Sequence, residues 1–295
     1  MCSNYNNVKV WDVKGNLLAD FQAQNGELTD TVFSSDGQLI LTTSLGEPSK
    51  AWVWDFKGNF LANLWHGGEV TTAVFSPDGQ RIVTASNDGN VKVWDVKGNL
   101  LTNFQGHADR VRSIAFSPDG QWIVTTSFDN TAKVWDTKGN LQTNLKGHQK
   151  FVISAAFSPD GQRIVTASDD STAKIWDRAG NLMADLKGHQ QGVTSAVFSP
   201  DGKRILTESS DGTAKVWDTK GNLLADLKEY KKEVSRAAFS SDGKRVFTVF
   251  SDGSINTWQV GELDDLLARG CNWLQDYFIS HPETRESLKV CQVKS

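Results

Sequence analysis

Short runs of alternating apolar and polar residues, each closed by a turn signal, make up most of the chain. In one stretch these runs cover residues 111–116, 122–126, 131–135 and 141–145, with Gly- and Asn-containing turns between them. Alternation with a period of two, β-branched residues and tight turns are typical of antiparallel strands. The pattern therefore predicts four strands of about five residues in each unit.

The unit repeats along the chain, and tryptophan marks its phase. Seven tryptophans are separated by 43, 40, 41, 41, 41 and 41 residues, and all but the last precede an Asp. One four-stranded sheet cannot bury both of its faces alone, whereas copies stacked around an axis can. The repeat therefore predicts a ring of sheets. The phased residues are Trp11, Trp54, Trp94, Trp135, Trp176, Trp217 and Trp258.

The combination of Gly-His and Trp-Asp pairs at this period resembles the WD-repeat β-propellers, over roughly residues 7–258. The resemblance implies an all-β fold, with a propeller of four-stranded antiparallel blades over residues 1–260. It also implies a hydrogen-bonded tetrad in each blade, in which Trp donates, Thr relays, His orients and Asp accepts. The matching residues are His66, Thr84, Asp88 and Trp94; His107, Thr125, Asp129 and Trp135; His148, Thr166, Asp170 and Trp176; and His189, Thr207, Asp211 and Trp217.

A repeated set of His, Asp and Thr could also suggest a catalytic triad or a metal site. One functional site does not need four copies in register, so the repetition indicates a structural role. The sequence contains no P-loop, no nucleophile elbow and no metal-ligand pair outside the tetrads. We therefore expect no catalytic residues, no metal and no cofactor.

The number of blades depends on how the ring closes. The pattern gives 25 strands: two at the start, five sets of four, and three that end at Trp258. A six-bladed ring is favoured, in which residues 17–21 form the outer strand of the last blade and residues 8–11 are surplus. A seven-bladed ring uses all seven tryptophans but lacks three strands. An unpaired half-blade is also what a cut inside a longer array would leave, and it allows either a monomer or association through an imperfectly closed blade.

Beyond residue 260 the period stops and the spacing becomes helical. Leu263, Leu266, Leu267 and Leu274 recur at helical intervals, with acidic residues in the first turn. Residues 261–295 are predicted to form a helical tail packed on the propeller, with a partner-binding or dimerising helix as the alternative. The tail resembles those that follow WD-repeat arrays in large bacterial signalling proteins, notably cyanobacterial ones.

Composition narrows the possible surroundings and partners. The net charge is −4, which does not favour nucleic acid or an anionic membrane, and no apolar stretch reaches 18 residues. Three scattered cysteines argue against a disulfide scaffold and for a reducing, cytoplasmic compartment. The favoured function is a protein-interaction scaffold or sensor. A propeller that binds small molecules or nucleic acid, and the regulatory half of a signalling ATPase, remain alternatives.

The expected contact positions follow from the resemblance. In the family, contacts on one face come from residues that flank the first Val of each blade and from the residue before the tetrad Asp. Most matching positions here are polar or small, but three in adjacent blades are apolar and lie beside two arginines. Aromatic and Arg clusters mark interaction hot spots, although these rings could instead tuck into the central channel. The predicted partner-binding residues are Arg110, Arg112, Phe128, Phe151, Ile153 and Asp169.

Overall fold

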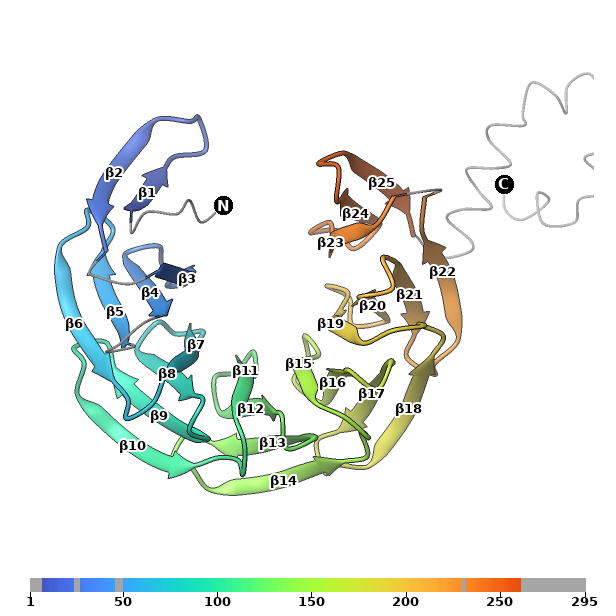
Figure 1. Cartoon of the computed structure of the whole chain (residues 1–295), viewed down its shortest axis with the longest axis horizontal. Helices are drawn as coiled ribbons and strands as arrows, with labels where there is room; N and C mark the ends of the chain where they lie inside the picture. The colour runs from blue at the N-terminus through green and yellow to red at the C-terminus, as the bar shows by residue number, and fades with distance from the viewer. Residues whose placement is uncertain (1–6, 24–26, 46–49, 230–231, 261–295) are drawn as a thin grey trace, which may run out of the picture.

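The computed structural model describes residues 7–23, 27–45, 50–229 and 232–260. In these residues all regular structure is β, arranged as seven antiparallel sheets. Figure 1 shows the sheets side by side in an open ring, with the first strand of each complete sheet innermost. The predicted all-β propeller is therefore confirmed. The helix predicted for residues 261–295 lies outside the described residues.

Five of the sheets are complete four-stranded blades, and the sheets at the two ends of the ring are smaller. The ends are β1 (Asn7–Trp11) with β2 (Leu17–Gln22), and β23 (Val234–Phe239), β24 (Arg245–Phe250) and β25 (Ile255–Gln259). The first two complete blades are β3 (Glu27–Phe33), β4 (Leu39–Leu45), β5 (Lys50–Asp55) and β6 (Phe60–Trp65); and β7 (Val70–Phe75), β8 (Arg81–Ser86), β9 (Asn90–Asp95) and β10 (Leu100–Gln105). The other three are β11 (Val111–Phe116), β12 (Trp122–Ser127), β13 (Thr131–Asp136) and β14 (Leu141–Lys146); β15 (Val152–Phe157), β16 (Arg163–Ser168), β17 (Thr172–Asp177) and β18 (Leu182–Lys187); and β19 (Val193–Phe198), β20 (Arg204–Ser209), β21 (Ala214–Asp218) and β22 (Leu223–Leu227).

Repeated turn chemistry separates the strands. Between β11 and β12 the Ser117 hydroxyl donates to Asp119, whose carboxylate also accepts from the Gln121 N–H at 3.0 Å. Gly120 takes a φ of 67°, a left-handed conformation that glycine adopts without strain. In the turn between β13 and β14, Asp136 accepts from the backbone and side-chain nitrogens of Asn140 at 2.9 and 2.8 Å. These turns return each strand antiparallel to the one before it.

The hydrophobic core lies between neighbouring blades. In one cluster Val134 and Leu145, from the blade β11–β14, pack with Val152, Ile164 and Trp176 from the next blade. All five side chains are almost fully buried. Because a single blade is too thin to bury both faces, each sheet is stabilised by the next one.

Arginines also tie successive blades together. The Arg163 guanidinium donates to the Gly202 carbonyl of the next blade at 2.9 Å, and Arg204 donates to Gly243 at 3.0 Å. Trp122 occupies this position in the blade β11–β14 and cannot make the same bond. There, the guanidinium of Arg178 from the next blade lies 4.6 Å from the centroid of the Trp122 ring.

The ring does not close in the way the sequence suggested. The predicted six-bladed closure, with residues 17–21 as the outer strand of the last blade, is wrong, because β2 pairs with β1. Within the described residues β25 pairs only with β24. The result is seven sheets, with the half-blade β1–β2 and the three-stranded sheet at opposite ends of the ring (Figure 1).

The physical reason is local. A short turn joins β1 to β2, so their pairing costs little loop entropy, whereas a partner in the last blade lies more than 200 residues away. The hairpin also buries Val8, Val10 and Ala19 against Trp52 and Trp54 of the next blade. If β2 paired with the last blade instead of β1, this buried contact would be lost.

Candidate functional site

The predicted tetrads of three blades are hydrogen-bonded chains. In the blade β11–β14 the Trp135 indole N–H donates to the Thr125 hydroxyl at 2.9 Å, and that hydroxyl lies 2.7 Å from His107 Nε2. His107 Nδ1 lies 2.9 Å from a carboxylate oxygen of Asp129. An ionised carboxylate can only accept, so the neutral imidazole carries its proton on Nδ1 and accepts from Thr125 at Nε2. The same contacts recur in His148, Thr166, Asp170 and Trp176, and in His189, Thr207, Asp211 and Trp217.

The aspartates of these three tetrads are held in the ionised form. Burial alone would raise the pKa of Asp170, but hydrogen bonds from His148, from the Thr172 hydroxyl and from a backbone N–H outweigh it. The pKa of Asp170 therefore lies well below its usual range, as does that of Asp129. The same balance lowers the pKa of Asp211 to about 2.

The fourth predicted tetrad is incomplete. His66 Nε2 lies 2.6 Å from the Thr84 hydroxyl, and Trp94 donates to the same hydroxyl at 2.8 Å. His66 Nδ1, however, is buried without a hydrogen-bond partner, and Asp88 accepts from the Asn90 N–H instead. Burial has the largest effect on the pKa of His66 and lowers it. Repulsion from Lys92 lowers it further, whereas attraction to Asp88 raises it, and the resulting pKa is about 4.

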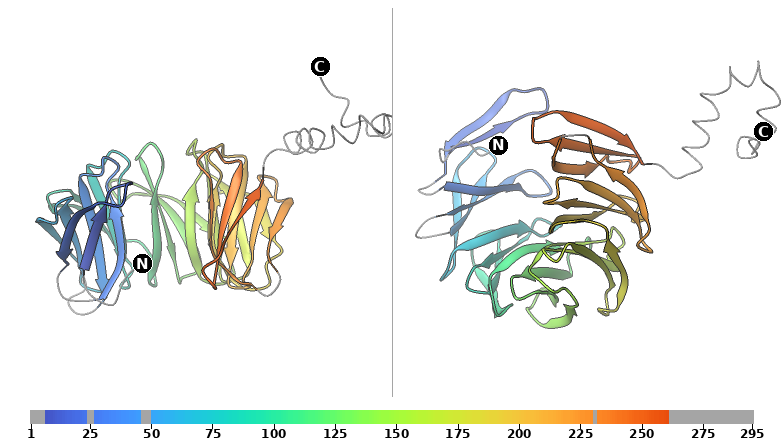
Figure 2. Two further views of the ribbon diagram at one scale, coloured as in Figure 1. Left: turned by 90° about the horizontal axis from the view of Figure 1, so that it is seen from above. Right: turned by 45° about the vertical axis from the view of Figure 1, so that its right-hand side comes forward.

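The predicted contact positions come together at one end of the blades. In each complete antiparallel blade the first strand begins, and the second strand turns into the third, at this end, which we call the loop face. A repeated backbone bond joins the two positions: the Phe128 N–H donates to the Arg110 carbonyl at 3.1 Å, and the Asp169 N–H donates to the Phe151 carbonyl at 3.0 Å. Figure 2, in its side view, shows the loops gathered at the two ends of the strands.

Phe128 and Phe151 lie against each other across two blades. Their ring centroids are 4.4 Å apart and their planes are inclined by 14°, so the rings stack. Phe151 is 42% exposed and Phe128 is half-buried. The alternative prediction, that both rings tuck into the central channel, is not what the structure shows for Phe151, which does not line that channel.

The innermost strands surround a cavity of about 730 Å³. Arg110, Arg112, Phe128 and Ile153 line it, whereas Phe151 and Asp169 do not. Asp169 is exposed and lies against Gly192 of the next blade, where an added Cβ would clash with the Asp169 carboxylate. The structure thus brings four of the six predicted partner-binding residues to the cavity and places Phe151 beside it.

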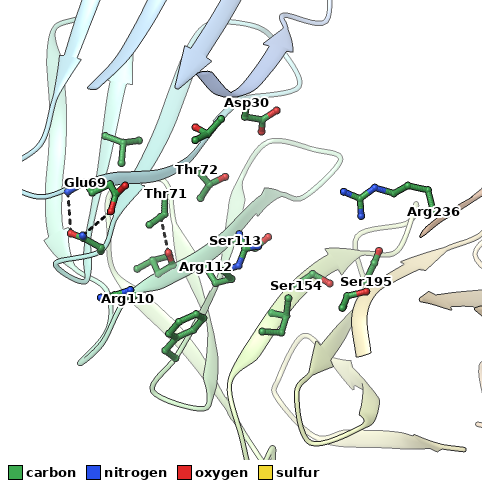
Figure 3. Close-up of a pocket in the computed structure, with 17 residues that line it drawn as sticks. Asp30, Glu69, Thr71, Thr72, Arg110, Arg112, Ser113, Ser154, Ser195 and Arg236 are labelled. Carbon is green, nitrogen blue, oxygen red and sulfur yellow. Dashed lines mark hydrogen bonds between the residues drawn. The ribbon is translucent and has the colours of Figure 1, made fainter. Parts of the chain in front are cut away.

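The prediction missed residues on the opposite wall of the cavity. Figure 3 shows Arg236 pointing into the cavity from the side opposite Arg112, with Asp30 on a third side. Arg236 lies 3.8 Å from the buried Glu208, which also accepts from the Ala237 N–H at 2.7 Å. A signal existed, because Arg236 interrupts a run of hydroxyl residues spaced by 41 positions. That run consists of Thr72, Ser113, Ser154 and Ser195, and all four line the cavity.

The part of the chain that the structure describes has neither a metal-binding cluster nor a membrane-spanning helix. It contains no group of three or more His, Cys, Asp or Glu side chains placed to hold a metal ion. It also forms no helix with the length and apolar character needed to cross a lipid bilayer.

Two family models match the sequence. One, described as WD domain, G-beta repeat, matches residues 58–95, and with the blade geometry it defines the class of protein: a WD-repeat β-propeller. The other, described as IFT122 first beta-propeller, matches residues 111–268, which is more than half of the chain. The chain therefore belongs to the IFT122 first beta-propeller family. No curated protein matches it.

Proposed function

We propose that this chain is a protein-interaction module with no catalysis of its own, and that its partner binds the loop face at Phe128 and Phe151. WD-repeat propellers generally act as protein-interaction scaffolds. The observation that carries the proposal is the stacked pair, with Phe151 exposed, beside Arg110 and Arg112 at the cavity. Exposed aromatic rings next to arginine are typical of the centre of a protein interface.

The test is a quantitative pull-down after chemical crosslinking, followed by mass spectrometry. The double variant Phe128→Ser/Phe151→Glu should lose the proteins that wild type captures, because burying one such ring contributes about 2 kcal/mol, roughly thirtyfold in affinity. Ser210 occupies the same repeat position as Phe128, two blades away. Ser210→Glu is therefore the matched control and should still capture the proteins that wild type captures. Capture that survives the double variant would refute the proposed face.

We also propose a cytoplasmic location and a role in signalling. The first is supported by three scattered cysteines, which suit a reducing compartment. The second is supported by the resemblance to bacterial signalling arrays. Fractionation of cells that express the tagged chain would test the location.

A further inference from the structure

Among the described residues, six arginines use their guanidinium groups in ion pairs, hydrogen bonds or ring contacts, and two do not. Arg81, Arg163 and Arg204 donate to the next blade, Arg178 lies over Trp122, Arg245 lies over Phe247 and Arg236 lies near Glu208. Within the described residues, Arg110 and Arg112 form no ion pair, guanidinium hydrogen bond or ring contact. Both are exposed, and both line the cavity.

These two arginines line the same cavity as the apolar side chains of Phe128 and Ile153. The backbone bond from Phe128 to Arg110 fixes the stacked rings beside the start of β11, and half-buried Ile153 lies in the adjacent blade. Arg112 and Ile153 occupy the same repeat position, 41 residues apart, where another blade has Thr194. A ligand that reaches these arginines therefore also meets Phe128 and Ile153.

We infer that the partner presents an extended acidic segment, in which a carboxylate pairs with Arg110 or Arg112 and a neighbouring apolar side chain packs on Phe128 and Phe151. This inference rests on the proposed function and names the chemistry of the partner at the same face. Arginine binds a carboxylate through two parallel hydrogen bonds. Among the described residues no carboxylate forms an ion pair with Arg110 or Arg112.

The surrounding charges favour a peptide over a nucleic acid. Glu69 and Asp30 line the same cavity, and exposed Asp109 and Asp169 flank it. A continuous phosphate backbone would meet these four carboxylates, whereas an acidic peptide can place single carboxylates opposite the arginines. The hydroxyl groups of Thr72, Ser113 and Ser195 offer hydrogen bonds to a peptide backbone.

The size of the cavity agrees with an inserted segment. Cavities that take ligands typically enclose about 300–1,000 Å³, and this one encloses about 730 Å³. Glu69, Arg110 and Phe128, which lie at the loop face, line it, and Phe151 is exposed at the same face. A partner that binds the rings can therefore extend a few side chains into the cavity.

The first experiment selects a phage library of random dodecapeptides on the full chain, with counter-selection on Arg110→Glu/Arg112→Glu. We expect enriched peptides to carry Asp or Glu within three residues of Leu, Ile or an aromatic residue. Enrichment of basic or uncharged peptides, or no enrichment, would overturn the inference. A single-stranded oligothymidine of twelve nucleotides serves as the polyanion probe, and tighter binding of this probe than of the selected peptide would also overturn it.

The second experiment measures the selected peptide by fluorescence anisotropy. Arg112→Glu should weaken binding of the selected peptide at least tenfold. A peptide with Lys in place of its acidic residue should bind the Arg112→Glu variant more tightly than it binds the wild-type chain. Lys146→Glu, an equal change of net charge on the outer strand of the same blade, should have no effect. Equal weakening by both variants would show a bulk-charge effect and overturn the inference.

The two proposals can fail separately. If the phenylalanine variants abolish protein capture while the arginine variants change neither capture nor peptide binding, the interaction face stands and the acidic chemistry is wrong. If the phenylalanine variants have no effect, the face itself is wrong.

Discussion

Thr125, Thr166 and Thr207 each accept from a tryptophan indole and donate to a histidine, and each is fully buried. A buried polar group without a partner costs free energy, so these chains stabilise the blades only while every member is present. Among the four predicted tetrads, that of His66 is the exception: its Nδ1 has no hydrogen-bond partner, and burial above all lowers the pKa of His66 to about 4.

The first prediction concerns the tetrad aspartate. Asp170→Ala leaves the buried His148 Nδ1–H and the Gln149 N–H without their acceptor, at a cost of about 1–3 kcal/mol. Asp88→Ala is the matched control, because Asp88 makes no bond to His66, and it should cost clearly less. Urea denaturation measures both, and equal losses would contradict the assigned chain.

The second prediction concerns pH. His66 has a folded-state pKa of about 4 against an ordinary value of 6.5, so the unfolded state binds the proton more readily. The free energy of unfolding should therefore fall as the pH drops from 6.5 to 4, with His66 contributing at most about 3 kcal/mol. The pKa of His189 is also lowered, mainly by burial, so the comparison must be made between variants.

In that comparison His66→Gln should flatten the pH dependence between pH 6.5 and 4. Asp211 acts in a lower pH range. Its pKa of about 2 lies below the ordinary 3.8, so its contribution to the free energy of unfolding is present above pH 4 and is lost as the pH falls toward 2. An unchanged slope in His66→Gln would show that the imidazole is not buried in its neutral form.

At the scale of the strand, the half-blade β1–β2 determines how the ring ends. Val8 and Val10 face Trp52 and Trp54 of the next blade, while the intervening Lys9 points to solvent beside Asp20. The burial alternates along β1, as expected for a strand with one covered face.

The third prediction follows from this alternation. Val10→Ser should lower the free energy of unfolding by about 2 kcal/mol, because a buried apolar side chain is lost, whereas Lys9→Ser should change it little. If β2 closed the last blade and displaced β1, the two variants would be equally mild. Thermal denaturation of both, side by side, separates these cases.

Strand positions were predictable because each blade repeats the same turn chemistry. Each strand of the middle blades adjoins a Ser-Pro-Asp-Gly or a Gly-Asn turn, and the described residues form the 25 strands that the pattern predicted. The pairing of β2 could not be read from the pattern, since β1 and β25 carry similar signals and loop entropy decides between them. The missing bond between His66 and Asp88 could not be read from the tetrad spacing either. Asn90 stands where other copies have a Thr whose hydroxyl bonds the tetrad Asp.

At the scale of the whole molecule, the ring of blades acts as a rigid frame for variable positions. Inter-blade cores and arginine links fix the innermost strands, and the loop face then presents residues that differ from blade to blade. Arg236 shows that such departures can be found from the sequence, because it breaks a run of hydroxyls at one repeat position. The repeat position alone does not decide whether a departure lines the cavity, because Arg110 lines it and Phe151, at the same position of the next blade, does not.

The most direct test of the interaction face is site-specific photocrosslinking in cells. Benzoylphenylalanine replaces Phe151 in one form of the chain and Leu182 in another; both side chains are exposed, but Leu182 lies on the outer strand β18. We predict protein adducts from position 151 and few from position 182. Adducts from position 182 alone, or equally from both, would contradict a binding face at the stacked phenylalanines.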